Sequence, residues 1–159
     1  QLYILEHTKD IRYSKFNKNT KRRNKMASLS SIEGIGKVFA KKLEKAGVRG
    51  TNSLLTACGT KKGREELSKT TGISKKRLLE WTNHADLFRI TGIGSEYADL
   101  LEAAGVDTVP ELGQRNPKTL HETMVKTNER KKLVRKLPTA EQVADWAKQA
   151  KKLKRAIEY

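Results

Sequence analysis

The residues with the clearest chemical potential lie in one short stretch, residues 32–48, with the sequence IEGIGKVFAKKLEKAGV. Two glycines around an isoleucine, Gly34-Ile35-Gly36, allow a tight turn and a close approach of the backbone to a partner. A helix that begins at Lys37 would direct unpaired N–H groups at that partner, and its dipole favours an anion there. Further positive charge comes from Lys41, Lys42 and Lys45. The pattern predicts a site that binds a phosphate group.

The same element occurs a second time at residues 90–106, ITGIGSEYADLLEAAGV, with more than half of the aligned positions identical. We expect the middle isoleucine of each copy to point inward. The second copy carries acidic neighbours, namely Glu96, Asp99, Glu102, Asp107 and Glu111. Because these carboxylates would repel phosphate, Gly92, Ile93 and Gly94 are predicted to form a structural corner or a surface that faces another protein.

A third, degenerate copy is predicted within residues 66–81, ELSKTTGISKKRLLEW, where Gly72-Ile73-Ser74 replaces Gly-Ile-Gly. We expect it to contribute to phosphate binding through Gly72, Ser74, Lys75 and Lys76. Other basic stretches that could extend the same face are Lys61, Lys62 and Arg64; Arg77; and Lys126, Arg130, Lys131, Lys132, Arg135 and Lys136. The sequence does not say whether these clusters share one face.

Helical spacing of apolar residues predicts an all-α protein. Gly47 and Gly105 are expected to end their helices, Ser74 and Thr139 to begin theirs, and the paired Trp81 and Trp146 to anchor the core. The expected helices cover residues 28–32, 37–46, 51–57, 62–70, 75–90, 95–104, 108–113, 117–136 with a break, and 139–156.

With these elements in place, the chain shows two family resemblances. Each Gly-Ile-Gly stretch has the pattern apolar-x-Gly-apolar-Gly, with alanine four positions after the second glycine. This pattern is similar to the helix-hairpin-helix motif of DNA repair, replication and recombination proteins. That resemblance implies a hairpin that holds the DNA backbone without reading sequence, with hairpins working in pairs. Over residues 28–153 the chain also resembles a bacterial domain-of-unknown-function family, family 4332, which supports tandem helix-hairpin-helix repeats of SAM-like fold and leaves the activity open.

The repeats divide the chain into a basic extension, residues 1–27, and two similar halves, residues 28–87 and 88–159. The extension lacks helical periodicity, so we expect it to be disordered or foreign to the native protein. The chain of 159 residues has a net charge of +16, which favours a polyanionic partner. The lone cysteine, Cys58, is expected to be a small buried apolar residue.

No catalytic constellation or metal-binding spacing is apparent, so we predict neither an enzyme nor a cofactor or metal site. His84 is expected on a helix surface. The favoured function is sequence-nonspecific binding of nucleic acid, duplex DNA before RNA, without membrane association and in the cytoplasm or on the nucleoid. The alternatives are a protein–protein adaptor with structural hairpins, whose partner would meet the acidic second copy, and binding to RNA or the ribosome.

Overall fold

The computed structural model describes residues 27–159, and the predictions for residues 1–26 lie outside this range. The described residues contain eight α-helices and one short 3-10 helix, with no strand among them. In chain order these elements are η1 (Leu29–Ser31), α2 (Lys37–Lys45), α3 (Thr51–Cys58), α4 (Lys61–Thr71), α5 (Lys75–Leu87), α6 (Ser95–Ala103), α7 (Val109–Gln114), α8 (Pro117–Lys131) and α9 (Ala140–Lys152). The predicted all-α class is therefore confirmed, and no helix in this part of the chain has the length and apolar character needed to cross a bilayer.

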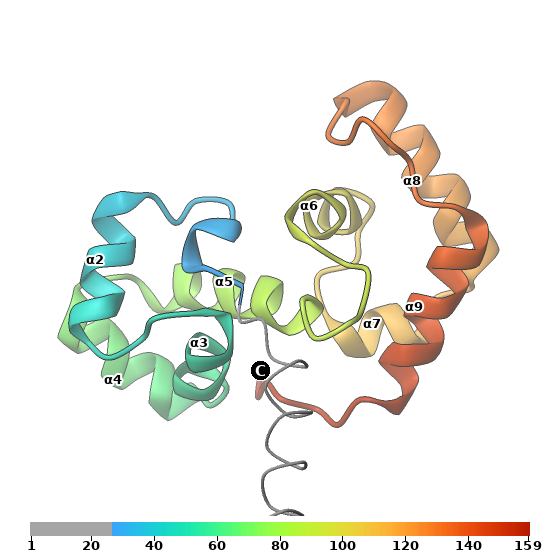
Figure 1. Cartoon of the computed structure of the whole chain (residues 1–159). Coiled ribbons are helices and arrows are strands. Elements are labelled where there is room, and N and C mark those ends of the chain that lie inside the picture. The colour runs from blue at the N-terminus through green and yellow to red at the C-terminus, as the bar shows by residue number, and fades with distance from the viewer. Residues whose placement is uncertain (1–26) are drawn as a thin grey trace, which may run out of the picture.

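Two hydrophobic clusters organise the molecule. One gathers buried side chains between residues 29 and 85, from η1 to α5, and the other gathers those between residues 87 and 150, from the end of α5 to α9. Phe88 packs against both clusters. Figure 1 shows the same arrangement, with η1 to α4 on the left, α6 to α9 on the right and α5 running between them.

Equivalent aromatic pairs lie in the two clusters. Phe39 and Trp81 pack edge-on with ring centres 5.3 Å apart, and Tyr97 and Trp146 pack at a tilt with ring centres 5.2 Å apart. Both tryptophans are buried, as predicted. Each pair therefore holds a helix that follows a Gly-Ile-Gly turn against the last long helix of the same cluster.

The helix ends follow the predicted capping chemistry. At the end of α2, Val48 N–H donates to Leu43 O (2.9 Å) and Gly47 N–H donates to Glu44 O (3.0 Å), with Gly47 at φ +87°. This is the Schellman pattern, in which glycine supplies the left-handed residue. The same bonds recur at the end of α6. Ser74 and Thr139 cap α5 and α9 through their side chains, as expected.

Three helices, α5, α8 and α9, end three or more residues earlier than predicted. Helix α5 ends at Leu87, and the chain then forms the second Gly-Ile-Gly turn. Helix α8 ends at Lys131, because Lys132 adopts a left-handed conformation with φ +49°. The side chain of Asn128 then bonds both backbone groups of Val134, which holds the returning chain against α8. Helix α9 ends at Lys152, and the remaining residues run back toward the first cluster (Figure 1).

The returning C-terminal segment is fixed by backbone contacts. Glu158 N–H donates to Gly59 O at 2.7 Å, and the side chain of Ile157 is buried. A Cβ on Gly59 would lie 2.7 Å from Ala156 O, so this approach requires glycine. The segment thereby joins the end of the second cluster to the α3–α4 corner of the first.

Candidate nucleic-acid interface

The first Gly-Ile-Gly stretch forms a tight turn that leads into α2. Ile35 N–H donates to Ile32 O at 3.2 Å, and Gly34, the third residue of the turn, has φ +87°. These are the features of a type II turn, which needs glycine at this position. Ile35 is buried, as predicted, so the turn is anchored to the core below it.

The N-terminus of α2 is open. Gly36 is the N-cap residue and supplies no side-chain hydrogen bond, and the first backbone bond into the helix runs from Ala40 N–H to Gly36 O at 2.9 Å. The amides of Lys37, Val38 and Phe39 therefore have no acceptor within the helix. All of Gly36, Lys37 and Val38 are exposed. This end of α2 offers N–H donors and the positive end of a helix dipole to solvent.

Basic residues from two helices converge beside this turn. Lys42 Nζ of α2 lies 5.9 Å from the ring centre of Phe39, and Arg77 Cζ of α5 lies 5.0 Å from the same centre. The basic clusters around residues 37–45 and 75–77 are therefore neighbours, which the sequence alone could not establish. Arg77 belongs to a predicted basic run but not to the predicted site, because its proximity to Phe39 depends on tertiary packing.

The α4–α5 turn is built differently from the Gly-Ile-Gly turns. Gly72 ends α4 in the left-handed conformation at φ +72°, and Ser74 begins α5. The hydroxyl of Ser74 accepts the N–H of Arg77 at 3.3 Å, so one first-turn donor is already bonded. Lys75 and Lys76 are exposed beside this cap. This turn is thus a partial counterpart of the first, with basic side chains and fewer free amides.

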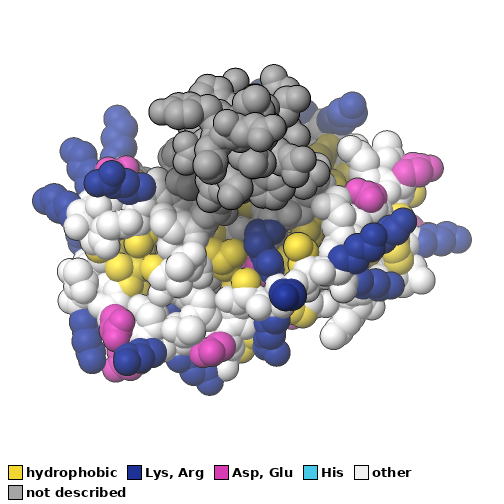
Figure 2. Space-filling model, turned by 60° about the horizontal axis from the view of Figure 1, so that its bottom comes forward, with side chains coloured by type: hydrophobic (Ala, Val, Ile, Leu, Met, Phe, Trp, Pro, Cys, Tyr) yellow, Lys and Arg dark blue, Asp and Glu magenta, His cyan; other side chains and the backbone are white. Residues whose placement is uncertain are grey.

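The basic cluster of α8 and the following loop lies elsewhere. Its exposed members are Lys126, Arg130, Lys131, Lys132, Arg135 and Lys136. In Figure 1 this end of α8 is at the upper right, whereas α2 is at the upper left. On the face drawn in Figure 2, Lys and Arg side chains project at both ends of the molecule rather than in one patch. The α8 cluster therefore lies at the other end of the molecule from α2.

Arg64 corrects one predicted extension of the basic face. Its side chain is buried, and its guanidinium donates to Cys58 O (2.8 Å), Gly59 O (3.3 Å) and Glu158 O (2.6 Å). These carbonyls come from the end of α3 and from the C-terminal segment. Arg64 therefore joins these two segments and is not part of the basic surface, whereas Lys61 and Lys62 are exposed.

The second Gly-Ile-Gly turn repeats the geometry of the first with different charges. Ile93 N–H donates to Ile90 O at 3.2 Å, Gly92 has φ +97°, and Gly94 caps α6 without a side-chain bond. Ile93 is buried, as predicted. The position equivalent to Lys41 is Asp99. The backbone of the second copy can therefore offer the same donors, but acidic side chains surround them.

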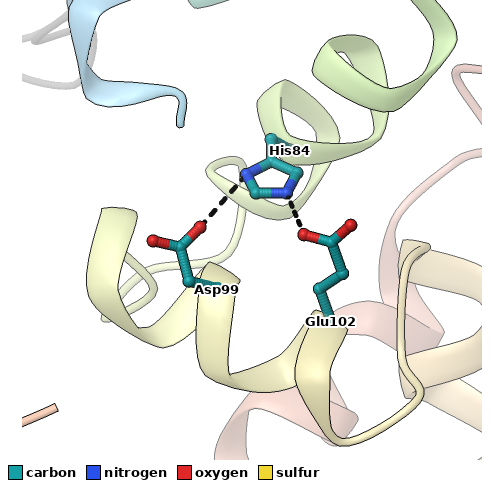
Figure 3. A group of neighbouring side chains, drawn as sticks. All are labelled: His84, Asp99 and Glu102. Carbon is teal, nitrogen blue, oxygen red and sulfur yellow. Dashed lines mark hydrogen bonds and ion pairs between the residues drawn. The ribbon is translucent and has the colours of Figure 1, made fainter. Parts of the chain in front are cut away.

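His84 corrects a second expectation, because it is buried rather than on a helix surface. It lies in α5 with 7 % of its surface exposed, and its Nε2 is 2.7 Å from Glu102 Oε2 of α6. Its Nδ1 lies 3.7 Å from Asp99 Oδ1 (Figure 3). Burial raises the pKa of Asp99 to about 6, together with the negative charges of Glu33 and Glu102, while His84 opposes this rise.

One family model covers most of the chain. A family model described as Domain of unknown function (DUF4332) matches residues 33–153, from the first turn to the end of α9. The chain belongs to this family. The same comparisons find no match among curated proteins or among solved structures.

Proposed function

We propose that this protein binds the phosphate backbone of duplex DNA without reading its sequence, through the open N-terminus of α2 and the basic side chains beside it. In this proposal, η1 to α2 and α4 to α5 act as a pair of helix-hairpin-helix units in the first half of the chain. The second half repeats the arrangement, with its Gly-Ile-Gly turn serving as a structural corner.

The observation that carries the proposal concerns Gly36, the N-cap residue of α2. The fold itself does not require glycine at this position, so its presence suits close contact with a ligand. Gly36 has φ −79°, which any residue adopts, and a Cβ built there meets nothing within 4 Å. Helices α4, α5, α8 and α9 instead begin with Thr, Ser or Asn side chains that bond a first-turn amide. An uncapped helix N-terminus suits an anion that approaches the amides closely.

Charge supports the first copy as the binding site. Lys37 follows Gly36 directly, and Lys42 and Arg77 flank the Phe39 ring beside the turn. Phosphate contacts of this kind fix a protein on DNA without carrying sequence information. Gly94 has equally free surroundings but acidic neighbours, so charge distinguishes the two copies while the backbone does not.

The proposal is tested by fluorescence anisotropy of the full chain with a labelled DNA duplex over a series of salt concentrations. The double variant Lys42→Gln/Arg77→Gln should weaken binding and reduce the slope of log K against log [salt] by up to about 1.8, about 0.9 for each lost phosphate contact. The matched control is Lys126→Gln/Arg130→Gln, which removes one Lys and one Arg from α8. Equal losses in both double variants would contradict an interface confined to the first half.

A protein–protein adaptor remains the second candidate function, because acidic side chains surround the second turn, whose backbone geometry matches that of the first. Those residues include Glu96, Asp107 and Glu111, all of which lie outside the buried core. Wild-type protein that fails to bind duplex DNA at low salt would favour this candidate. A preference for single-stranded or structured RNA over duplex DNA in the same assay would favour the RNA or ribosome alternative.

A further inference from the structure

We propose that His84 and Asp99 bind a divalent transition-metal ion such as Zn²⁺ between His84 Nδ1 and Asp99 Oδ1, with Glu102 orienting the imidazole ring. This inference does not depend on nucleic-acid binding. It assigns a role to a cluster that joins α5 to α6, with Glu33 of the first turn close to Asp99.

The hydrogen bond to Glu102 defines the protonation of the imidazole. A carboxylate only accepts, so the 2.7 Å contact between His84 Nε2 and Glu102 Oε2 places a proton on Nε2. In the neutral ring Nδ1 then carries a lone pair. Histidines that bind metals through one nitrogen ordinarily donate the other N–H to a carboxylate or carbonyl in this way. His84 and Glu102 have this arrangement.

The free nitrogen faces an oxygen that also lacks a partner. His84 Nδ1 and Asp99 Oδ1 are both buried, and neither has a hydrogen-bond partner in the described part of the protein. The side chain of His84 is 9 % exposed and that of Asp99 is 20 % exposed. A buried lone pair opposite a buried carboxylate oxygen is unfavourable unless a cation lies between them.

The separation of these two atoms favours a metal ion over a proton. At 3.7 Å, Nδ1 and Oδ1 are too far apart for an N–H···O hydrogen bond, which spans about 2.7–3.2 Å. Two ligand atoms bound tetrahedrally to Zn²⁺ at about 2.0–2.1 Å lie about 3.4 Å apart. A shift of a few tenths of an ångström would bring both atoms onto one ion.

The surroundings of the pair offer a further ligand close to the protein surface. The carboxylate of Glu33, in the first turn, lies close enough to Asp99 to raise its pKa. Glu33 and Glu102 are exposed and Asp99 is partly exposed, so the pair lies just below the protein surface. One imidazole nitrogen with carboxylate oxygens is a donor set suited to Zn²⁺ and other first-row divalent ions. A bound ion would tie the first turn to α5 and α6.

The test is isothermal titration of the full chain, freed of metal by a chelator, with ZnCl₂. We expect one site in the wild type and a rise in Tm of about 5 °C or more at a Zn²⁺ concentration of 100 Kd. Asp99→Asn should weaken Zn²⁺ binding by about tenfold or more, and Glu102→Gln by about tenfold. Asp99→Asn removes a carboxylate whose buried Oδ1 has no hydrogen-bond partner, so this variant should be at least as stable as wild type without metal.

Three matched controls keep the result specific. Glu44→Gln changes the exposed residue equivalent to Glu102 in the first copy, and His121→Gln and His7→Gln change the two other histidines. All three variants should bind Zn²⁺ as the wild type does. The proposal is overturned if the wild type binds no Zn²⁺, or if folded Asp99→Asn protein binds it as tightly as the wild type. Either result would leave the cluster as a structural contact in which His84 bonds Glu102 and joins α5 to α6.

Discussion

Gly92 lies directly against Trp146, so that a Cβ built on Gly92 would come within 2.9 Å of the indole Nε1. In the first copy, a Cβ on Gly34 would lie 3.3 Å from Nε1 of Trp81. Two features thus favour glycine at the first position of each turn: the positive φ, and the tryptophan indole that leaves little space for a Cβ. Neither feature is present at the second glycine of each turn, Gly36 or Gly94, where φ is negative and a Cβ would meet no atom within 4 Å.

This difference predicts unequal effects of two neighbouring substitutions. Gly92→Ala should lower the free energy of unfolding by about 2 kcal/mol or more, because a positive φ alone costs an alanine about 1–2 kcal/mol and the indole must also move. Gly94→Ala should change it by about 1 kcal/mol or less in either direction. Urea unfolding followed by circular dichroism measures both. A Gly94→Ala variant as unstable as Gly92→Ala would contradict this account of the turn.

The buried guanidinium of Arg64 should be a large contributor to stability. Arg64→Met removes the donor for three backbone carbonyls, and we expect the free energy of unfolding to fall by about 2–4 kcal/mol. The matched control is Lys62→Met on the same helix, where the exposed pair with Glu66 at 3.9 Å contributes little. A loss of less than about 1 kcal/mol in Arg64→Met would show that these bonds are not needed to hold the C-terminal segment.

The thiol of Cys58 should be unreactive in the folded protein. Burial raises the pKa of the Cys58 thiol, and this effect outweighs the opposing influences of Thr82 and Arg64. A buried thiol with a raised pKa provides little accessible thiolate at about pH 8. Labelling with a chromogenic disulfide reagent should therefore be slow in buffer and rapid in denaturant. Stoichiometric labelling of the native protein within seconds would contradict the observed burial.

Local sequence signals predicted the elements well, because caps and turns depend on nearby residues. Gly34, Gly47 and Ser74 mark a turn, a helix end and a helix start by their own conformational preferences, and each behaves as expected. The repeated tryptophans were recognised as core residues from their equivalent positions. The sequence alone therefore predicts the all-α class. It also predicts the first residues of five helices, namely α2, α3, α5, α6 and α8.

Features that depend on distant segments were missed. Nothing in the run after Ala150 breaks a helix, yet Arg89 donates to Lys154 O across the molecule and the chain becomes extended there. Arg64 and His84 looked like surface residues because their partners, Glu158 and Glu102, lie 94 and 18 residues further on. Tertiary hydrogen bonds thus overrode local preference in each case.

The central claim is that the open N-terminus of α2 holds a phosphate, and one pair of substitutions tests it most directly. Gly36→Ser places a capping hydroxyl over the free amides of α2, and Gly94→Ser makes the same change at α6. Both should keep or raise stability by up to about 1 kcal/mol, because serine caps helices at least as well as glycine and restricts the unfolded chain.

The measurement is the affinity of the two folded full-length variants for a labelled DNA duplex, by anisotropy at one fixed salt concentration. We predict that Gly36→Ser weakens binding by about tenfold, which corresponds to the loss of about 1.4 kcal/mol in charge-assisted hydrogen bonding, and that Gly94→Ser binds as the wild type does. Equal affinities for wild type, Gly36→Ser and Gly94→Ser would contradict the claim that α2 amides hold the DNA backbone.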